Sequence, residues 1–190
     1  MKTCIALFAS GSGTNAENFI HHFQNHPQID VGLVFSNKPT AGVISRAYKN
    51  NVPVVVAGKQ LLYSESYFLS LLAQHDIDFI VLAGFLWLIP DYLTAKYHQR
   101  MVNIHPALLP KYGGRGMYGN QVHRAVLANK EKTTGITIHY VNNQYDEGNI
   151  IFQAECPVLE SDTPDLLAER VHMLEYEHYP QVVQGLLEKS

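Results

Sequence analysis

Short apolar runs of strand length alternate with amphipathic segments through the first half of the chain, about 1–100. Strands are expected at the apolar runs, which lie at 4–9, 31–36, 52–56 and 79–83. Helices are expected where apolar residues recur at helical spacing, over 15–25, 41–50 and 62–74. Because parallel neighbours need a long crossover connection, this alternation predicts a mostly parallel sheet.

The second half, about 101–190, follows a different pattern. Its expected elements are a strand, a Gly/Pro-rich loop, a short helix and two further strands, over 101–104, 106–120, 121–129, 135–141 and 149–156. Only a short polar segment separates the last two strands, which favours an antiparallel pair. A final helix is expected from Thr163, a capping residue followed by Pro164 and Asp165.

The two patterns together predict one α/β domain spanning 1–190. Its expected architecture is Rossmann-like, with a mostly parallel central sheet, an antiparallel C-terminal portion and helices on both faces. Hydrophobic residues make up 46% of the 190 residues, which is enough apolar material to fill such a core.

Charge and hydropathy exclude several classes of partner. The formal net charge of −3 lacks the surplus of lysine and arginine that a nucleic-acid-binding protein needs. No stretch approaches the ~18 apolar residues of a membrane span, and the N-terminus lacks the pattern of a secretory leader. Cys4 and Cys156 lie in apolar runs without metal-type spacing, so buried free thiols are favoured over a disulfide. We expect a soluble cytoplasmic protein.

A loop rich in small residues follows the first strand and opens the first helix. It comprises Gly11, Ser12, Gly13, Thr14 and Asn15. Glycines let a ligand approach the backbone, and the N-terminus of a helix favours an anion. The second strand ends without the acidic residue that a dinucleotide site requires, so a mononucleotide-type phosphate is favoured over a dinucleotide. A tight turn without a ligand remains the alternative.

Asn103 and His105 close a strand and enter the Gly/Pro-rich loop. Alternation along a strand places both on one face, at the carboxyl end where open α/β sheets bind ligands. The polar segment 142–148 brings carboxylates, including Asp146, that could turn towards His105. A structural histidine and a solvated hairpin turn are the plainer interpretations.

Five segments, in this order along nearly the whole chain, resemble the phosphoribosylglycinamide formyltransferases of the folate-dependent formyltransferase family. They are Ser-Gly-Ser-Gly-Thr-Asn at 10–15, Val-Phe-Ser-Asn-Lys at 34–38, Leu-Ala-Gly-Phe at 82–85, Asn-Ile-His-Pro-Ala-Leu-Leu-Pro-Lys-Tyr at 103–112, and Ile-His-Tyr-Val at 138–141 with Asp146 and Gly148 downstream. The Asn-x-His-Pro-x-Leu-Leu-Pro run with a downstream Asp is specific to the wider family. The Gly/Ser/Thr/Asn loop is typical of the purine-biosynthesis branch.

The resemblance implies transfer of the formyl group of 10-formyltetrahydrofolate, a co-substrate, to the amine of glycinamide ribonucleotide in de novo purine biosynthesis. Asn103 would donate to the developing oxyanion, and His105 would stabilise that charge or deliver a proton. Asp146 would orient the imidazole, favour its charged form and relay the proton of the amine. No metal is implied. His105, His123 and His139 are an alternative metal-ligand set, but Asn103 and Asp146 fit proton chemistry better.

The resemblance also assigns the binding residues. The ribonucleotide would contact Gly11, Ser12, Gly13, Thr14, Asn15, Pro106 and Glu175. The folate would contact Leu86, Trp87, Leu88, Ile89, Asn103, His139, Val141 and Asp146. By spacing alone, Glu175 reads as a surface carboxylate on a helix, and the stripe at 86–89 reads as core.

Three positions depart from the family pattern. Trp87 stands where many relatives have arginine, and Ser64 stands where a basic residue often helps to bind the phosphate. The loop 113–119 is longer than in the relatives compared and is either a mobile lid or a surface excursion. Rival activities are a formyltetrahydrofolate hydrolase, a formyltransferase for another amine, and a dinucleotide-dependent oxidoreductase. The sequence leaves monomer and homodimer open.

Overall fold

The computed structural model describes residues 2–189, and within them seven strands form one mixed sheet in the order β3-β2-β1-β4-β5-β6-β7. The strands are β1 (Thr3–Ala9), β2 (Ile29–Ser36), β3 (Val54–Val56), β4 (Phe79–Leu82), β5 (Met101–His105), β6 (Thr133–Tyr140) and β7 (Ile150–Pro157). Strands β1 to β5 pair in parallel, whereas β6 and β7 are added antiparallel. The predicted Rossmann-like, mostly parallel sheet with an antiparallel C-terminal portion is confirmed.

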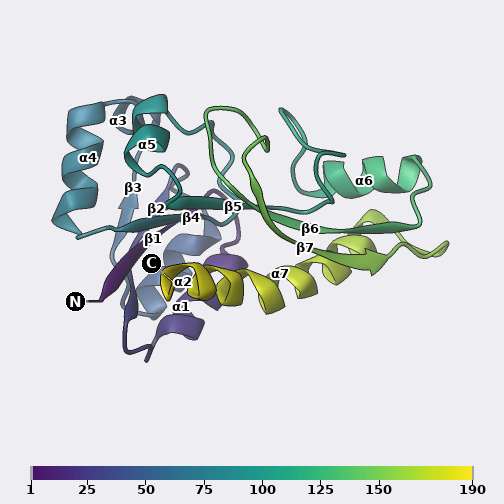
Figure 1. The fold of residues 1–190 in the computed structure, drawn as a ribbon, viewed down its shortest axis with the longest axis horizontal. Coiled ribbons are helices and arrows are strands. Elements are labelled where there is room, and N and C mark those ends of the chain that lie inside the picture. The colour runs from purple at the N-terminus through teal and green to yellow at the C-terminus, as the bar shows by residue number, and fades with distance from the viewer. Residues whose placement is uncertain (1, 190) are drawn as a thin grey trace.

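Helices cover both faces of the sheet (Figure 1). They are α1 (Thr14–Phe23), α2 (Gly42–Lys49), α3 (Lys59–Leu62), α4 (Glu65–Gln74), α5 (Asp91–Lys96), α6 (Asn120–Ala128) and α7 (Pro164–Leu187). One face packs against α1, α2 and α7, and the other packs against α3, α4 and α5. Helix α6 packs against α7 through a smaller apolar cluster. Among the helices described, none combines the length and the apolar character needed to cross a membrane.

Strand β1 is continuously apolar because both of its faces are buried. Ile5 and Leu7 face the α1 side of the sheet, whereas Ala6 and Phe8 face the α4 side, and all four are fully buried. A parallel strand covered on both faces has no solvent side, so it does not alternate with polar residues. Phe8 contacts the rings of Phe35, Phe68 and Phe85 at centroid distances of 4.9, 6.0 and 5.5 Å.

The helix expected over 62–74 is instead two helices, because the chain turns at Tyr63 and Ser64. Ser64 has extended backbone angles and starts α4. The Tyr63 hydroxyl donates to the carbonyl of Leu88 at 3.0 Å, and the Tyr92 hydroxyl donates to the carbonyl of Leu62. These two hydrogen bonds join the turn between α3 and α4 to residues 88 and 92, which are far away in the sequence. The spacing of apolar residues along 59–74 therefore does not predict the turn. The six-residue helix α5 was also missed, because it is too short to show a period.

Helix α7 is fastened to the two central strands by one buried hydroxyl. Tyr179 is fully buried, and its hydroxyl lies 3.0 Å from the carbonyl of Leu82 and 3.2 Å from that of Val102. Its ring meets Phe19 edge-on at 4.9 Å, so one side chain joins α7, α1, β4 and β5. The carboxyl end of β4 and the first residues of β5 are thereby fixed relative to α7.

We expect Tyr179→Phe to lower the free energy of unfolding by about 1–2 kcal/mol, because a buried hydrogen bond is lost without a change of shape. Urea denaturation followed by circular dichroism measures this loss. Tyr48→Phe is the matched control, since Tyr48 is 65% exposed, and it should change stability by less than about 0.5 kcal/mol. Equal stability of both variants would contradict a structural role for the Tyr179 hydroxyl.

Candidate active site

A cavity of about 480 Å³ opens at the carboxyl ends of β1, β4 and β5. Every residue that the sequence assigned to catalysis or binding lines it: Gly11, Ser12, Gly13, Thr14, Asn15, Leu86, Trp87, Leu88, Ile89, Asn103, His105, Pro106, His139, Val141, Asp146 and Glu175. By its spacing alone, the apolar segment 86–89 would be interpreted as part of the core, but its residues line the cavity. The expected placement at strand carboxyl ends is also found.

The small-residue loop reaches the cavity because its backbone takes a shape that only glycine adopts easily. Gly13 has φ of 80° and immediately precedes α1. A Cβ on Gly13 would lie 2.4 Å from the Cβ of Val43, so any side chain would clash with α2. The loop thus presents the N-terminus of the ten-residue helix α1 to the cavity, which is a favourable place for an anion.

Asn15 and Glu175 join α1 to α7 at this end of the cavity. The Asn15 Nδ2 donates to Glu175 Oε2 at 2.7 Å, and His172 Nε2 lies 4.0 Å from the same oxygen. Glu175 is only 5% exposed, and burial raises its pKa, against the opposing effects of His172 and Asn15. Glu175 is therefore a buried cavity group, and the plainer interpretation of a surface carboxylate is wrong. The Asn15 Oδ1 is buried without a partner.

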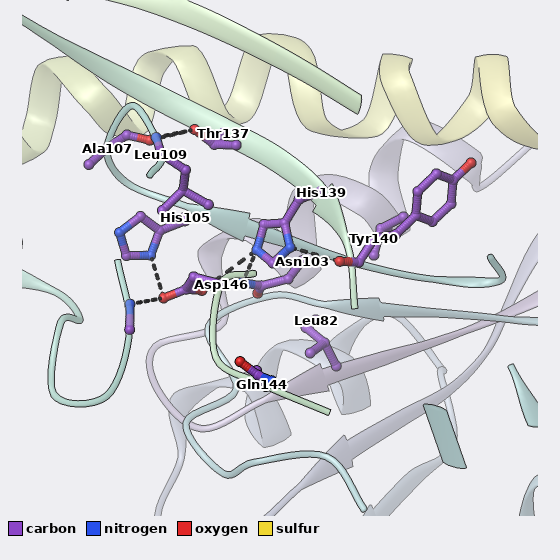
Figure 2. A network of polar contacts seen from close by, with 12 residues as sticks. Leu82, Asn103, His105, Ala107, Leu109, Thr137, His139, Tyr140, Gln144 and Asp146 are labelled. Atoms are coloured by element: carbon purple, nitrogen blue, oxygen red, sulfur yellow. Dashed lines mark hydrogen bonds and ion pairs between the residues drawn. The ribbon is translucent and has the colours of Figure 1, made fainter. Parts of the chain in front are cut away.

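Asn103 leaves β5 towards Asp146 and His139, as Figure 2 shows. Its Nδ2 lies 3.1 Å from His139 Nε2 and 3.4 Å from Asp146 Oδ1. The Nδ1 of His139 faces the carbonyl of Tyr140 at 2.8 Å. A carbonyl only accepts, so Nδ1 carries the proton and Nε2 accepts from Asn103 when the ring is neutral. The bond from Asn103 to Asp146 is the longer and weaker of the two.

His105 lies at the end of β5 with its two ring nitrogens in different surroundings. Its Nε2 donates to the carbonyl of Tyr112 at 2.7 Å, and its Nδ1 lies 3.4 Å from Asp146 Oδ2 (Figure 2). Because Nε2 must keep its hydrogen, Nδ1 is the atom that gains or loses a proton, directly beside the carboxylate.

Burial lowers the pKa of His105, although Asp146 and the Tyr112 carbonyl both act to raise it. The ring is therefore mainly neutral at pH 7. The Asp146 carboxylate favours the imidazolium, but burial outweighs that effect on the pKa of His105.

Asp146 is held ionised although it is mostly buried. Burial acts to raise its pKa, but His139, the charge of His105 and the N–H of Gly114 more than offset that effect, so the pKa is lowered. The Gly114 N–H donates to Oδ2 at 2.9 Å, and His139 Nε2 lies 3.6 Å from Oδ1. The φ of 58° at Asp146 is one that aspartate tolerates better than most residues. A carboxylate in this position is a ready proton acceptor beside Nδ1 of His105.

One buried hydroxyl organises the chain that follows His105. Thr137 Oγ1 donates to the carbonyl of Ala107 at 2.7 Å and accepts from the N–H of Leu109 at 2.9 Å. Gln153 Nε2 donates to the same hydroxyl at 2.8 Å and lies 3.1 Å from the carbonyl of Leu109. Since Thr137 also pairs with His105 across β5 and β6, strand pairing and this network position the loop together.

The loop 113–119 lies along the cavity, and its residues 115–119 line it. Gly114 and Gly116 have φ of 92° and 90°, and a Cβ at either would meet nothing within 4 Å. The bond from Gly114 to Asp146 ties the loop to the reactive end of the cavity. Lys59 Nζ lies 5.6 Å from the centre of the ring of Trp87, which is another residue of the cavity lining.

Several residues around the cavity were given no role in catalysis or substrate binding by the sequence. Tyr112 and Gly114 act through backbone groups, which side-chain patterns cannot reveal. Arg115, His123 and His172 line the cavity only because the 113–119 loop, α6 and α7 fold over it. Among residues 2–189, no three His, Cys, Asp or Glu side chains gather as a metal site would require.

Residues 3–183 match the formyl transferase family, and the chain belongs to that family. It is 34% identical to the phosphoribosylglycinamide formyltransferase of Bacillus subtilis (strain 168), over 96% of this chain and 93% of that protein. It is 40% identical to the chloroplastic phosphoribosylglycinamide formyltransferase of Arabidopsis thaliana, over 97% of this chain and 65% of that protein. The chain thus spans less than two thirds of this plant relative.

Solved structures of the family have the same fold. The crystal structure of glycinamide ribonucleotide transformylase 1 from Geobacillus kaustophilus superposes with a TM-score of 0.89 at 35% identity. The superposition covers 98% of this chain and 100% of the Geobacillus kaustophilus chain. The mixed sheet and the surrounding helices are therefore those of the family.

The pKa of His105 should lie below its ordinary value of 6.5, and Asp146→Asn should lower it further, because the Asp146 carboxylate is a main group that raises it. Histidine NMR titration measures both values. A folded pKa below the unfolded one also means that this group makes stability fall as the pH drops below about 6.5. Glu177→Gln, a change at an exposed carboxylate, should leave the His105 curve in place. A rise on Asp146→Asn would contradict the geometry.

Thr137→Val should lower the free energy of unfolding by about 1–3 kcal/mol, because the Leu109 N–H is left buried without a partner. The loss is measured by urea denaturation. Thr133→Val, on the exposed end of the same strand, is the control and should be near neutral. Unchanged stability of the Thr137 variant would show that the loop after His105 does not depend on this hydroxyl.

Proposed function

We propose that this protein transfers the formyl group of 10-formyltetrahydrofolate to the amine of glycinamide ribonucleotide, as a phosphoribosylglycinamide formyltransferase of purine biosynthesis. The observation that carries the proposal is one cavity containing both the N-terminus of α1 and the cluster of Asn103, His105 and Asp146. The names of the relatives support the choice of acceptor. The substrates are two small molecules, and no nucleic acid or membrane takes part.

The reaction needs a group that stabilises a developing oxyanion. The amine attacks the formyl carbonyl and gives a tetrahedral species whose oxygen carries negative charge. Asn103 can turn its weaker N–H, 3.4 Å from Asp146, towards that oxygen while it keeps its bond to His139. A preorganised donor of this kind is worth about 3 kcal/mol in the transition state.

The reaction also moves a proton from the attacking amine to the leaving folate nitrogen. Nδ1 of His105 and Oδ2 of Asp146, 3.4 Å apart, are the two groups that exchange protons here. The ionised Asp146 takes the surplus proton of the amine, directly or through water, and Nδ1 of His105 then carries a proton to the folate nitrogen. Tyr112 holds the other ring nitrogen and so keeps Nδ1 facing the cavity.

The ribonucleotide would lie with its phosphate at Gly11, Ser12, Gly13 and Thr14 and its ribose between Asn15 and Glu175. Backbone N–H groups at the start of α1 suit the phosphate. Glu175 accepts hydrogen bonds, and the unpaired Oδ1 of Asn15 offers a second acceptor for the ribose hydroxyls. Pro106 would then contact the part of the ribonucleotide that lies between its ribose and its amine.

The folate would occupy the opposite side of the cavity. Its ring would pack against Leu86, Trp87, Leu88 and Ile89 and reach Val141, next to His139 and Asp146. Lys59, over the ring of Trp87, supplies a positive charge where many relatives have arginine. In this arrangement the N-terminal half binds the phosphate, and the C-terminal half carries the proton chemistry. We infer a cytoplasmic enzyme that acts as a monomer or homodimer.

Folate absorbance with glycinamide ribonucleotide as acceptor tests the proposal. Turnover that requires the ribonucleotide is the expected result. Turnover at the same rate without it would identify a formyltetrahydrofolate hydrolase instead, and binding of a nicotinamide dinucleotide without folate turnover would identify the oxidoreductase alternative.

Asp146→Asn should lower kcat by more than ~100-fold, because the proton acceptor beside His105 is lost. The KM for the ribonucleotide should change little, since Asp146 lies away from the phosphate end. Steady-state kinetics measure both constants, and Asp30→Asn, at an exposed carboxylate on β2, is the control. Near-normal turnover in the Asp146 variant would remove Asp146 from the mechanism.

Asn15→Ala should raise the KM for the ribonucleotide about tenfold or more and leave kcat nearly unchanged, because the residue binds without taking part in the chemistry. Asn18→Ala is a matched control. Asn18 also ties α1 to α7, through a 2.8 Å bond to the carbonyl of Tyr176, but lies outside the cavity lining. A defect confined to kcat in the Asn15 variant would contradict its place at the ribonucleotide.

A further inference from the structure

His123 is a buried cavity residue that the proposed mechanism leaves unused. It lies on α6, is only 1% exposed, and lines the same cavity as His105 and Glu175. Its Nδ1 is buried without a partner, and within the described residues neither ring nitrogen makes a hydrogen bond. Buried polar groups are almost always paired, so an unpaired imidazole at a cavity wall points to a group that arrives with a ligand.

The ring is neutral under ordinary conditions. Burial lowers the pKa of His123 to about 4, with smaller contributions from His172 and His105. A neutral imidazole offers one N–H donor and one acceptor nitrogen. It therefore suits an uncharged polar group better than a phosphate or carboxylate, which would prefer a cation.

His123 lies within electrostatic range of both ends of the ribonucleotide site. At one end is His105, whose Nδ1 takes part in proton transfer. At the other is His172, which lies 4.0 Å from Glu175, and Glu175 accepts from Asn15 at 2.7 Å. A ligand that reaches from Asn15 and Glu175 to His105 therefore lies in the cavity whose wall includes His123.

In glycinamide ribonucleotide, the part between the ribose and the reacting amine is an amide, with one carbonyl acceptor and one N–H donor. We propose that His123 recognises this amide of the acceptor by a hydrogen bond and so fixes the distance from the ribose to the attacking amine. This inference rests on the proposed function and deepens it. His123 is a specificity residue here and takes no part in proton transfer.

The test compares two acceptors in two proteins. One acceptor is glycinamide ribonucleotide, and the other is an analogue in which the amide carbonyl is reduced to a methylene. For the wild-type enzyme, the analogue should lose about 10- to 100-fold in kcat/KM. His123→Leu should lose a similar factor on the natural acceptor but show little further loss on the analogue, because the bond that the analogue lacks is already gone.

Two further variants separate recognition from folding. His123→Gln keeps a donor and an acceptor and should retain more kcat/KM on the natural acceptor than His123→Leu does. It also serves as the test protein if the leucine variant does not fold, and it should then discriminate less between the two acceptors than the wild type. Val122→Ala, at a fully buried neighbour on α6, should lower stability without changing the ratio between the acceptors.

The outcomes are distinct. The full analogue penalty in the folded His123→Leu variant, or a natural-acceptor kcat/KM that this variant leaves unchanged, would overturn the role of His123 and leave the proposed function standing. Wild-type enzyme that fails to use glycinamide ribonucleotide would overturn the proposed function, and the inference would fall with it.

Discussion

The site depends on keeping one ionised carboxylate beside a neutral imidazole in a largely buried place. Asp146 is 11% exposed, yet its pKa is lowered, because Gly114, His139 and His105 together offset the effect of burial. His105 responds in the opposite way, and its pKa falls because burial outweighs the same carboxylate. An ionised carboxylate and a neutral imidazole thus lie 3.4 Å apart at neutral pH, as the proposed proton transfer would require.

Helix α7 connects this reactive end to the binding end of the cavity. Its Tyr179 bonds to the backbones of β4 and β5, which carry the cavity wall and the reactive residues. One turn earlier, Glu175 bonds to Asn15 at the start of α1. The same helix therefore sets the position of Asn15 and Glu175 relative to His105, and the proposed formyl transfer would need such a fixed distance because its rate would depend strongly on the placement of the reacting atoms.

Much of the fold follows from local pattern, and the failures have physical causes. The apolar runs correctly predicted the parallel strands, because a strand that is buried on both faces must be apolar throughout, as β1 is. The break between α3 and α4 was missed because it is held by the hydroxyls of Tyr63 and Tyr92, which bond to chain far away in sequence. Glu175 was read by spacing as a surface group for the same reason, since its burial is produced by α1.

The sequence by itself determined the α/β architecture, the glycine loop before α1 and the pairing of Asn103 with His105 on one strand face. Each of these follows from periodicity or from the conformational freedom of glycine, which are local properties. Only the tertiary structure decided that Asp146 meets His105, that burial keeps His105 neutral, and that His123 lines the cavity unpaired. Burial and the distances between segments far apart in sequence set these properties, and both exist only once the sheet and α7 have packed together.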